Sequence, residues 1–253
     1  MEEKIISIDQ GTSSTRSVLY SKRGELLDSS QEEFKQYFPN EGWVEHNPEQ
    51  IWKTVESTLM NVVEKNDISC NEIASIGITN QRETTVLWDK TTGRPISNAI
   101  VWQDRRTSEF CDHLSSDLDI IHKKTGLILD PYFSATKINW LLKNVEGARA
   151  LAEKGDLLFG TIDTFLIWKL TNGKSHKTDI TNASRTMLFN IVNQEWDQDL
   201  LKIFDVPKQI LPEVCDNASD FGSTSILGGE VKIGGVAGDQ QAALIGQCCF
   251  RSG

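Results

Sequence analysis

The sequence lacks the long apolar runs, paired-cysteine motifs and basic excess that mark several large protein classes. No apolar stretch approaches the roughly 18 residues of a membrane-spanning helix. Residues 1–4 are largely acidic and lack the charge pattern of a signal peptide. We therefore expect a cytoplasmic protein that does not insert into membranes.

Cysteine and histidine are too irregularly spaced for a disulfide framework or a zinc site. The five cysteines include one adjacent pair and no Cys-x-x-Cys motif, which indicates a reducing compartment. The four histidines have no metal-ligand spacing, and neither His-Glu-x-x-His nor Gly-x-Ser-x-Gly occurs. Zinc catalysis and a hydrolase triad are therefore poorly supported.

Basic residues are in deficit, with 26 lysines and arginines against 36 acidic residues and a net charge of −10. This balance argues against nucleic acid or an anionic membrane as a main partner. It does not exclude phosphate ligands, because local dipoles and a few arginines decide such binding. The 253 residues suffice for one large core or two smaller domains, and no repeat or low-complexity linker divides them.

The first strand and turn carry the strongest chemical signal. Three isoleucines between residues 5 and 8 predict a buried strand that ends at Asp9, and Gly11 then permits a tight turn. The turn continues with hydroxyl and basic side chains: Thr12, Ser13, Ser14, Thr15 and Arg16. Such a turn can surround a phosphate, while a strand-end carboxylate can hold Mg²⁺. A polar hairpin turn is the alternative, and the spacing is not that of a P-loop.

The residues after this turn predict two more strands and a helix. Residues 15–20 and 25–34 read as strands around a tight turn, so the chain begins with antiparallel strands. Asn47 and Pro48 then open a helix, with Gln50 closing a capping box. The apolar residues of this helix share one face that packs on the sheet: Ile51, Trp52, Val55, Leu59, Val62 and Val63. We predict a β-β-β-α opening.

Two later strands also end in polar clusters. Residues 73–79 predict a strand that leads to Arg82 and Glu83, and residues 98–102 predict another that ends at Trp102. Ligands of α/β sheets collect at the carboxyl ends of strands, so both ends are candidates to line one cleft. The adjacent opposite charges of Arg82 and Glu83 must either be paired within the protein or face a ligand.

The remaining elements are predicted from capping residues and apolar periodicity. We expect Arg105 and Arg106 at the solvated start of a helix over residues 104–114. Ser134 and Asp163 are expected to cap the helices that follow them. The other expected elements are helices 118–126 and 196–204, strands 84–88 and 157–161, a polar loop 179–185 and an extended segment 186–189.

A second strand followed by aspartate and glutamine occurs near the end of the chain. Residues 231–236 predict a strand that leads through Gly238 to Asp239 and a helix over residues 242–247. The pattern repeats that of the first strand and Asp9. Because aspartate is a favoured N-cap, a purely structural role for Asp239 is the alternative.

Seven segments together carry a resemblance to a known family. They are Asp9-Gln10-Gly11-Thr12, Gly42-Trp43-Val44-Glu45-His46, Gly77-Ile78-Thr79-Asn80-Gln81-Arg82-Glu83-Thr84, Val101-Trp102-Gln103, Asp130-Pro131-Tyr132-Phe133-Ser134-Ala135-Thr136-Lys137, Thr181-Asn182-Ala183-Ser184-Arg185-Thr186 and Ala237-Gly238-Asp239-Gln240-Gln241. In this order they resemble the N-terminal domain of the FGGY carbohydrate kinase family, and within it the members that phosphorylate glycerol. Residues 132–144 also fit the first signature of the family, and the resemblance covers essentially the whole chain.

The resemblance implies a fold and a domain organisation. The fold would be an α/β domain of the ribonuclease-H-like, actin-like ATPase type, with a mixed sheet, flanking helices and an active site between two such domains. Residues 1–253 would be the N-terminal, substrate-binding domain, and the C-terminal nucleotide-binding domain is expected to be absent from this chain. We therefore expect the isolated chain to be inactive or very weak as a kinase.

The resemblance also implies substrates and site residues. The substrates would be glycerol and ATP, with Mg²⁺ as cofactor and no nucleic-acid partner, and the full-length enzyme would be a homo-oligomer. Glycerol hydroxyls would contact one polar set: Arg82, Glu83, Tyr132, Asp239 and Gln240. ATP phosphates would contact the first turn: Thr12, Ser13, Ser14 and Arg16.

The remaining implied roles concern the reaction itself. Trp102 would wall the carbon backbone of glycerol, and Asp9 would help to hold Mg²⁺. Asp239 would be the general base, because a glycerol hydroxyl is a poor nucleophile until a carboxylate accepts its proton. Two alternatives remain open: another FGGY sugar or polyol kinase, and a non-catalytic actin-like binding domain.

Overall fold

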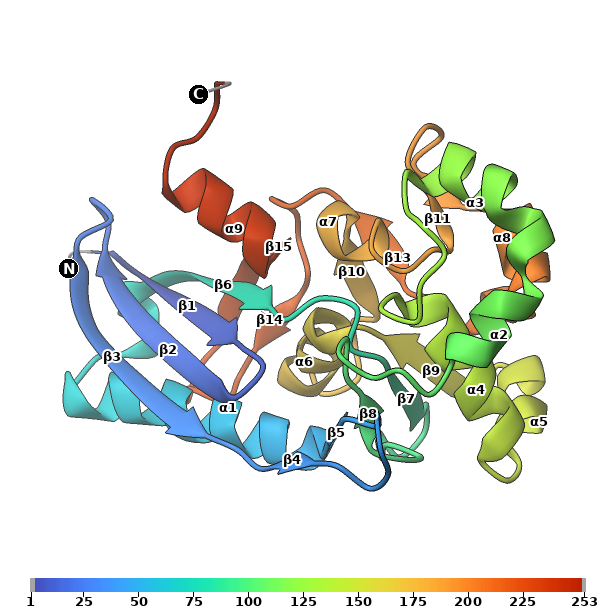
Figure 1. Ribbon diagram of the computed structural model, residues 1–253. Helices are drawn as coiled ribbons and strands as arrows, with labels where there is room; N and C mark the ends of the chain where they lie inside the picture. Colours follow the sequence, from blue (N-terminus) through green and yellow to red (C-terminus); the bar gives the residue numbers. More distant parts are fainter. Residues whose placement is uncertain (1–2, 252–253) are drawn as a thin grey trace.

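The computed structural model describes residues 3–251, and its centre is a six-stranded mixed sheet (Figure 1). The strands lie in the order β14-β15-β6-β1-β2-β3. β1 is antiparallel to β2 and parallel to β6, and β6 is parallel to β15. The carboxyl ends of β1, β6 and β15 therefore lie at the same edge of the sheet. The bounds are Ser223–Thr224 (β14), Val231–Gly238 (β15), Ile73–Asn80 (β6), Lys4–Gln10 (β1), Ser14–Ser21 (β2) and Leu26–Glu33 (β3).

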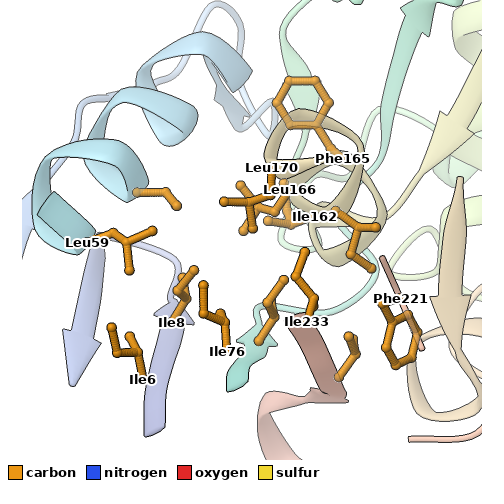
Figure 2. Close-up of a cluster of buried hydrophobic side chains, with 14 of the residues drawn as sticks. Ile6, Ile8, Leu59, Ile76, Ile162, Phe165, Leu166, Leu170, Phe221 and Ile233 are labelled. Atoms are coloured by element: carbon orange, nitrogen blue, oxygen red, sulfur yellow. The ribbon is translucent and has the colours of Figure 1, made fainter. Parts of the chain in front are cut away.

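Two helices, α1 (Pro48–Lys65) and α6 (Ile162–Leu170), close one face of this sheet. Side chains alternate between the faces of a strand, so every second residue of β1 and β6 enters the core. Figure 2 shows strand and helix residues that meet there: Ile6, Ile8, Ile76, Ile233, Leu59, Phe165 and Leu166. Burial of this apolar surface, at about 25 cal/mol per Å², stabilises the strand alignment.

The opposite face of the sheet is only partly covered. Ser7 and Asp9 of β1 point to this face, and Asp9 is exposed. Small residues of β6 and β15, such as Gly77 and Ala237, keep it shallow. Helix α9 (Asp239–Gly246) continues directly from β15 and packs against β15 and β6. In Figure 1, α9 rises from the carboxyl end of β15.

A second core lies among the helices and short strands that follow β6 (Figure 1). Residues such as Leu87, Ile138, Phe159 and Leu200 are buried in it. Its helices are α2 (Ser108–His113), α3 (Leu118–Thr125), α4 (Ser134–Asn144), α5 (Ala148–Lys154) and α8 (Gln198–Ile203). Helix α7 (Ile180–Ala183) packs instead against β15, and single 3₁₀ turns lie at Cys70–Glu72 just before β6, at Ser115–Asp117 and at Lys208–Ile210. Within residues 3–251, no helix has both the length and the apolarity to cross a membrane.

The remaining strands are short and form small sheets outside the central one. Three of them pair in the order β4-β5-β8, and the others pair as β7-β9, β10-β13 and β11-β12. Their bounds are Gln36–Tyr37 (β4), Glu45–His46 (β5), Val86–Asp89 (β7), Ala99–Ile100 (β8), Leu157–Gly160 (β9), Lys177–Asp179 (β10), Phe189–Asn190 (β11), Glu195–Trp196 (β12) and Glu213–Cys215 (β13). The β7-β9 pair joins the segment after β6 to the second core.

The predicted β-β-β-α opening is confirmed, with one error in the helix cap. The Asn47 side chain accepts bonds from the Glu49 and Gln50 backbone N–H groups at 2.9 and 3.3 Å. The capping box is wrong, because the Gln50 side chain accepts instead from the Tyr37 hydroxyl at 3.2 Å. Ile51, like most of the predicted apolar face of α1, is buried.

The expectation of a solvated Arg106 is wrong, although Arg105 is exposed as expected. The Arg106 side chain is 1 % exposed and forms ion pairs of 2.8 Å with both Asp104 and Glu45. Its guanidinium also lies 3.8 Å from the centre of the Trp43 ring. These contacts hold residues 104–106 out of the helix, which therefore begins only at Ser108.

Two predicted caps are also wrong. Ser134 is the first residue of α4, whose N-cap is Phe133, and its hydroxyl donates to the Glu83 carbonyl at 3.0 Å. Asp163 lies inside α6, whose N-cap is Thr161, and its carboxylate is fully buried. The predicted polar loop over residues 179–185 contains α7, with Asp179 as its N-cap. Contacts with other segments decide the positions of Ser134 and Asp163, since Ser134 bonds to Glu83 and Asp163 accepts from Thr178. Helix α5 was not anticipated.

His46 in β5 makes stability depend on pH. Its ring is fully buried against Phe34, and its Nε2 has no hydrogen-bond partner among residues 3–251. Burial lowers the pKa of His46 to about 4, whereas an unfolded histidine takes up a proton near pH 6.5. As the pH falls between these values, protons bind the unfolded chain first, so the folded state loses stability.

We therefore expect wild type to lose up to about 3 kcal/mol of unfolding free energy relative to His46→Gln between pH 7 and pH 4. Urea unfolding followed by circular dichroism at several pH values measures this difference. The exposed His113 provides the control, since His113→Gln should leave the wild-type pH dependence in place. A pH-independent difference between wild type and His46→Gln would contradict the assignment.

Candidate active site at the carboxyl ends of the parallel strands

The three parallel strands bring the predicted site segments to one edge of the sheet. Asp9 of β1 is in register with Thr79 of β6, and Thr79 is in register with Ala237 of β15. Arg82 and Glu83 follow β6, and Asp239 follows β15. Residues from three distant parts of the sequence therefore lie together, as expected for a ligand site of an α/β sheet.

Arg82 and Asp239 form the open part of this site. The Arg82 Nε lies 3.1 Å from the Asp239 Oδ1, while Nη1 donates to the Gln241 side chain at 3.2 Å. The Nε–H is not directed at this oxygen, and Nε is a buried donor without an acceptor among residues 3–251. The Asp239 side chain is 42 % exposed. A solvent-accessible carboxylate and a buried, unused donor therefore lie side by side.

Asp239 does not act as a helix cap. The N-cap of α9 is Gly238, and Asp239 is the first helical residue. Its Oδ1 accepts from the backbone N–H of Gln240 at 2.7 Å. The Gln240 side chain is exposed, and it is Gln241 that contacts Arg82. The structural alternative for Asp239 as an N-cap is therefore wrong.

Glu83 is the buried part of the site. Its side chain is 1 % exposed, accepts from Arg185 Nε at 2.6 Å, and lies 3.9 Å from Arg82 Nε. Burial raises the pKa of Glu83, although Arg185 and Arg82 oppose this shift. Its φ of 61° lies in the left-handed region that a bulky residue seldom adopts. Such strain persists where surrounding contacts enforce it, and it is common at ligand sites.

Aromatic side chains form a wall next to these charges. The Trp102 and Tyr132 rings lie 5.4 Å apart, and the Arg185 guanidinium lies 5.6 Å from the Tyr132 ring centre. Burial, followed by repulsion from Glu83, raises the pKa of Tyr132.

Lys137 is fully buried and donates to backbone carbonyls of the preceding loop, at 2.8 Å for Pro131 and 3.1 Å for Phe133. These bonds from Lys137 fix the loop that presents Tyr132.

The turn after β1 has the tight geometry that its glycine permits. The Gly11 N–H donates to the Ser14 carbonyl at 2.9 Å. The Thr12 hydroxyl accepts from Trp102 Nε1 at 3.0 Å, so the turn is joined to the aromatic wall. Ser13 is exposed, and the Ser14 hydroxyl accepts from a β3 side chain.

Asp9 and Arg16 stand opposite each other on β1 and β2. Partial burial, followed by repulsion from Asp239, raises the pKa of Asp9, while Arg16 lowers it. Solvent still reaches Asp9 on its open side, although protein atoms crowd the other. Asp9 and Ala237 are both in register with Thr79, so the ends of β1 and β15 flank the end of β6 at one edge of the sheet.

Sequence reasoning missed Arg185, Gln241, Thr79 and Lys137. Arg185 belongs to a polar segment with no assigned contact, and its partner Glu83 lies 102 residues away in the sequence. Thr79 Oγ1 is buried without a partner among the described residues and lies in register with Asp9. Lys137 lies in the first turns of α4 and donates back to the Tyr132 carbonyl in the loop before this helix, a contact that its spacing in the sequence does not reveal.

The fold and this site define the class of protein. A mixed sheet flanked by helices, with charged groups at the ends of its parallel strands, is the α/β arrangement of ribonuclease-H-like, actin-like ATPase domains. The chain belongs to the FGGY family of carbohydrate kinases, because the model of that family's N-terminal domain matches residues 4–246.

Known proteins with similar sequences and structures agree with this assignment. The chain is 58 % identical to a glycerol kinase of Alteromonas mediterranea over its whole length, and 59 % identical to one of Sinorhizobium fredii over 98 % of its length. These matches cover 52 % and 51 % of the two relatives, so the chain spans about half the length of the curated relatives it matches.

The solved structure of the Plasmodium falciparum glycerol kinase with ADP superposes with a TM-score of 0.94 at 36 % identity, covering 99 % of this chain and 51 % of the other. A xylulose kinase of Rhodospirillum rubrum superposes with a TM-score of 0.88 at 18 % identity over 98 % of this chain and 51 % of the other, which shows the shared fold alone.

Gly238 leaves space for the Arg82 side chain at the open part of the site. A Cβ added to Gly238 would lie 2.5 Å from Arg82 Cδ and 2.8 Å from Arg82 Cγ. The backbone φ of Gly238 is −60°, so alanine is not strained there. We therefore expect Gly238→Ala to fold and to push Arg82 away from Asp239, with the Nε–Oδ1 distance beyond the roughly 4 Å limit of an ion pair.

A crystal structure of the variant measures this distance. Gly246→Ala, at the other end of α9, is the matched control, because its Cβ would meet no atom within 4 Å. An unchanged Arg82–Asp239 pair in Gly238→Ala would show that the space at Gly238 does not decide the position of Arg82.

Proposed function

We propose that the protein phosphorylates glycerol with ATP, giving glycerol 3-phosphate, and that this chain supplies its substrate-binding domain. One observation carries the proposal: the unused Arg82 Nε donor lies beside the open Asp239 carboxylate and the buried Glu83 carboxylate. A hydroxyl needs one donor and one acceptor, and this arrangement offers both. The similarity to glycerol kinases supports the choice of alcohol.

Asp239 is the general base of the proposed reaction. Its carboxylate accepts the proton of the attacking hydroxyl as the oxygen bonds to the γ-phosphorus and the bond to ADP breaks. The Arg82 guanidinium, whose Nε lies 3.1 Å from Oδ1, holds the carboxylate in place. Glu83 and Arg82 orient the alcohol through its other hydroxyls, together with Tyr132 and Gln240. Trp102 excludes water from the carbon side.

The turn after β1 is the proposed phosphate side. Thr12, Ser13, Ser14 and Arg16 offer hydroxyl, backbone and guanidinium donors to ATP, with Asp9 beside them. The unpartnered Thr79 hydroxyl, in register with Asp9, fits a polar ligand at this point, such as a water of hydrated Mg²⁺. Within residues 3–251 no cluster of three or more ligating side chains occurs. Mg²⁺ commonly binds through one or two carboxylates plus substrate phosphates, so the metal would arrive with ATP and neutralise phosphate charge.

The proposed enzyme needs more than this chain. The chain spans about half of its glycerol kinase relatives, and the open Asp239 indicates a site that lacks a cover. We infer that a second domain binds the adenine and excludes water, and that the whole enzyme is a cytoplasmic homo-oligomer. The isolated chain should therefore turn over far more slowly than a full-length relative, and comparable turnover would contradict this inference.

The role of Asp239 is tested by Asp239→Asn in the full-length protein encoded by the reading frame of this chain. We expect kcat to fall by about 10²- to 10⁴-fold, because the amide cannot accept the proton, while the KM for glycerol changes little. A coupled assay of ADP release measures both constants. The control is Asp67→Asn, since Asp67 is exposed at a left-handed position that asparagine also accepts. Near-normal turnover of Asp239→Asn would exclude it as the base.

The choice of glycerol is tested by comparing kcat/KM for glycerol, xylitol and D-xylulose with the wild-type protein. We expect glycerol to be preferred by at least about 10²-fold, because the polar groups of the site are then all paired. Preference for xylulose or xylitol would identify another sugar or polyol kinase. Binding of ATP with no phosphorylation of any alcohol would instead support a non-catalytic actin-like domain.

A further inference from the structure

A buried polar cluster lies behind the site and contacts the ends of two strands. We call it the polar platform and define it by five residues from β10, α7 and the segments beside them: Asn80, Asp179, Thr181, Asn182 and Asn217. Asp179, Asn80 and Asn182 are fully buried. None of these residues has a role in the reaction described above.

The platform holds the end of β15. The backbone N–H of Gly238 donates to the Thr181 hydroxyl at 2.8 Å, and this hydroxyl donates to the Asp179 carboxylate. Asn217 Nδ2 donates both to Asp179 Oδ2 at 2.8 Å and to the Val236 carbonyl at 3.0 Å. The residues immediately before Asp239 are therefore attached to one buried carboxylate.

The same carboxylate holds the end of β6. Asn182 Nδ2 donates to Asp179 Oδ1 at 2.7 Å, and the side-chain amides of Asn182 and Asn80 exchange two hydrogen bonds of 3.0 Å. Asn80 is in register with Gly238 on the neighbouring strand. The platform therefore joins the strand end that leads to Arg82 and Glu83 to the strand end that leads to Asp239.

The platform also has the properties of a rigid support. Asp179 accepts from the backbone N–H groups of Thr181 and Asn182 at 2.7 and 3.3 Å, as the N-cap of α7. Arg185, which follows α7, bonds to Glu83. A buried carboxylate with this many donors is held in one orientation, because any movement leaves buried polar groups unpaired.

We propose that Asp179 and Thr181 are positioning residues for phosphoryl transfer: they fix the end of β15 so that Asp239 keeps its place beside Arg82 and Glu83. The inference rests on the proposed function, because it assigns Asp239 the role of base. Its physical basis is alignment, since a misplacement of about 1 Å can cost about 10²-fold in rate.

Thr181→Val is the sharpest variant, because it removes the hydroxyl and keeps the shape of the side chain. The backbone bonds that cap α7 remain, so the variant should fold. Loss of the Thr181 acceptor should speed hydrogen exchange of the Gly238 amide by about tenfold. Thr181→Ser keeps the hydroxyl and should restore slow exchange. Exchange is followed by NMR or mass spectrometry, and circular dichroism checks that the variants fold.

Kinetics of the full-length protein then decide whether the bond serves the reaction. We expect Thr181→Val to lower kcat about tenfold with the KM for glycerol within about twofold, and Thr181→Ser to recover most of it. Thr125→Val is the matched control, because the buried Thr125 hydroxyl also accepts from a backbone N–H, that of Leu127, but bonds to no platform residue. Its kcat and its Gly238 exchange should stay close to those of wild type.

The outcomes separate this inference from the proposed function. Unchanged Gly238 exchange in Thr181→Val would overturn the attachment of β15 to the platform. Faster exchange with unchanged kcat, or an equal loss of kcat in Thr125→Val, would overturn the positioning role. A wild-type protein that phosphorylates no alcohol would overturn the proposed function itself, and with it the reaction that this positioning serves.

Discussion

The parallel alignment of β1, β6 and β15 is the constraint on which the rest of the structure depends. It is stabilised on one face by the core that α1 and α6 close. Because the strands run in the same direction, their carboxyl ends lie at one edge of the sheet. The residues that follow each strand, such as Arg82 and Asp239, are therefore brought together at this edge. The opposite face carries small side chains and remains open around Asp9. One face thus provides stability and the other provides the site.

Of the two carboxylates that lie near Arg82 at this edge, Glu83 is buried and Asp239 is open to solvent. Glu83 is buried, and an isolated buried carboxylate is costly unless it is paired. Arg185 supplies most of that pairing, which leaves the Nε of Arg82 free of a directed bond although Asp239 is close by. The buried Glu83–Arg185 ion pair fixes the structure of the site, and the solvent-accessible Asp239 is the carboxylate proposed to accept the proton. The polar platform holds both strand ends from behind.

The prediction from sequence was accurate where the signal was local and periodic. The β-β-β-α opening, the Asn47 cap and the apolar face of α1 all depend on neighbouring residues, and all are confirmed. It failed for polar side chains whose partners are distant in the chain. Arg106 was expected in solvent but is buried against Trp43, and Asp163 was expected to cap a helix but lies inside one. A prediction from residue type places charged side chains in solvent, whereas a hydrogen-bond or ion-pair partner from another segment allows them to be buried.

The sequence by itself determined the β-β-β-α opening, through hydrophobic periodicity, and nominated Asp9, Arg82, Glu83 and Asp239, through strand ends and resemblance. Only the tertiary structure decided how these residues are divided between burial and exposure. The pairing of Arg185 with Glu83 and the support of β15 by Asp179 both depend on the packing of α7 against the ends of β6 and β15. The physical reason is that hydrogen bonds and ion pairs depend on distances of about 3 Å, and sequence separations of about 100 residues carry no such distances.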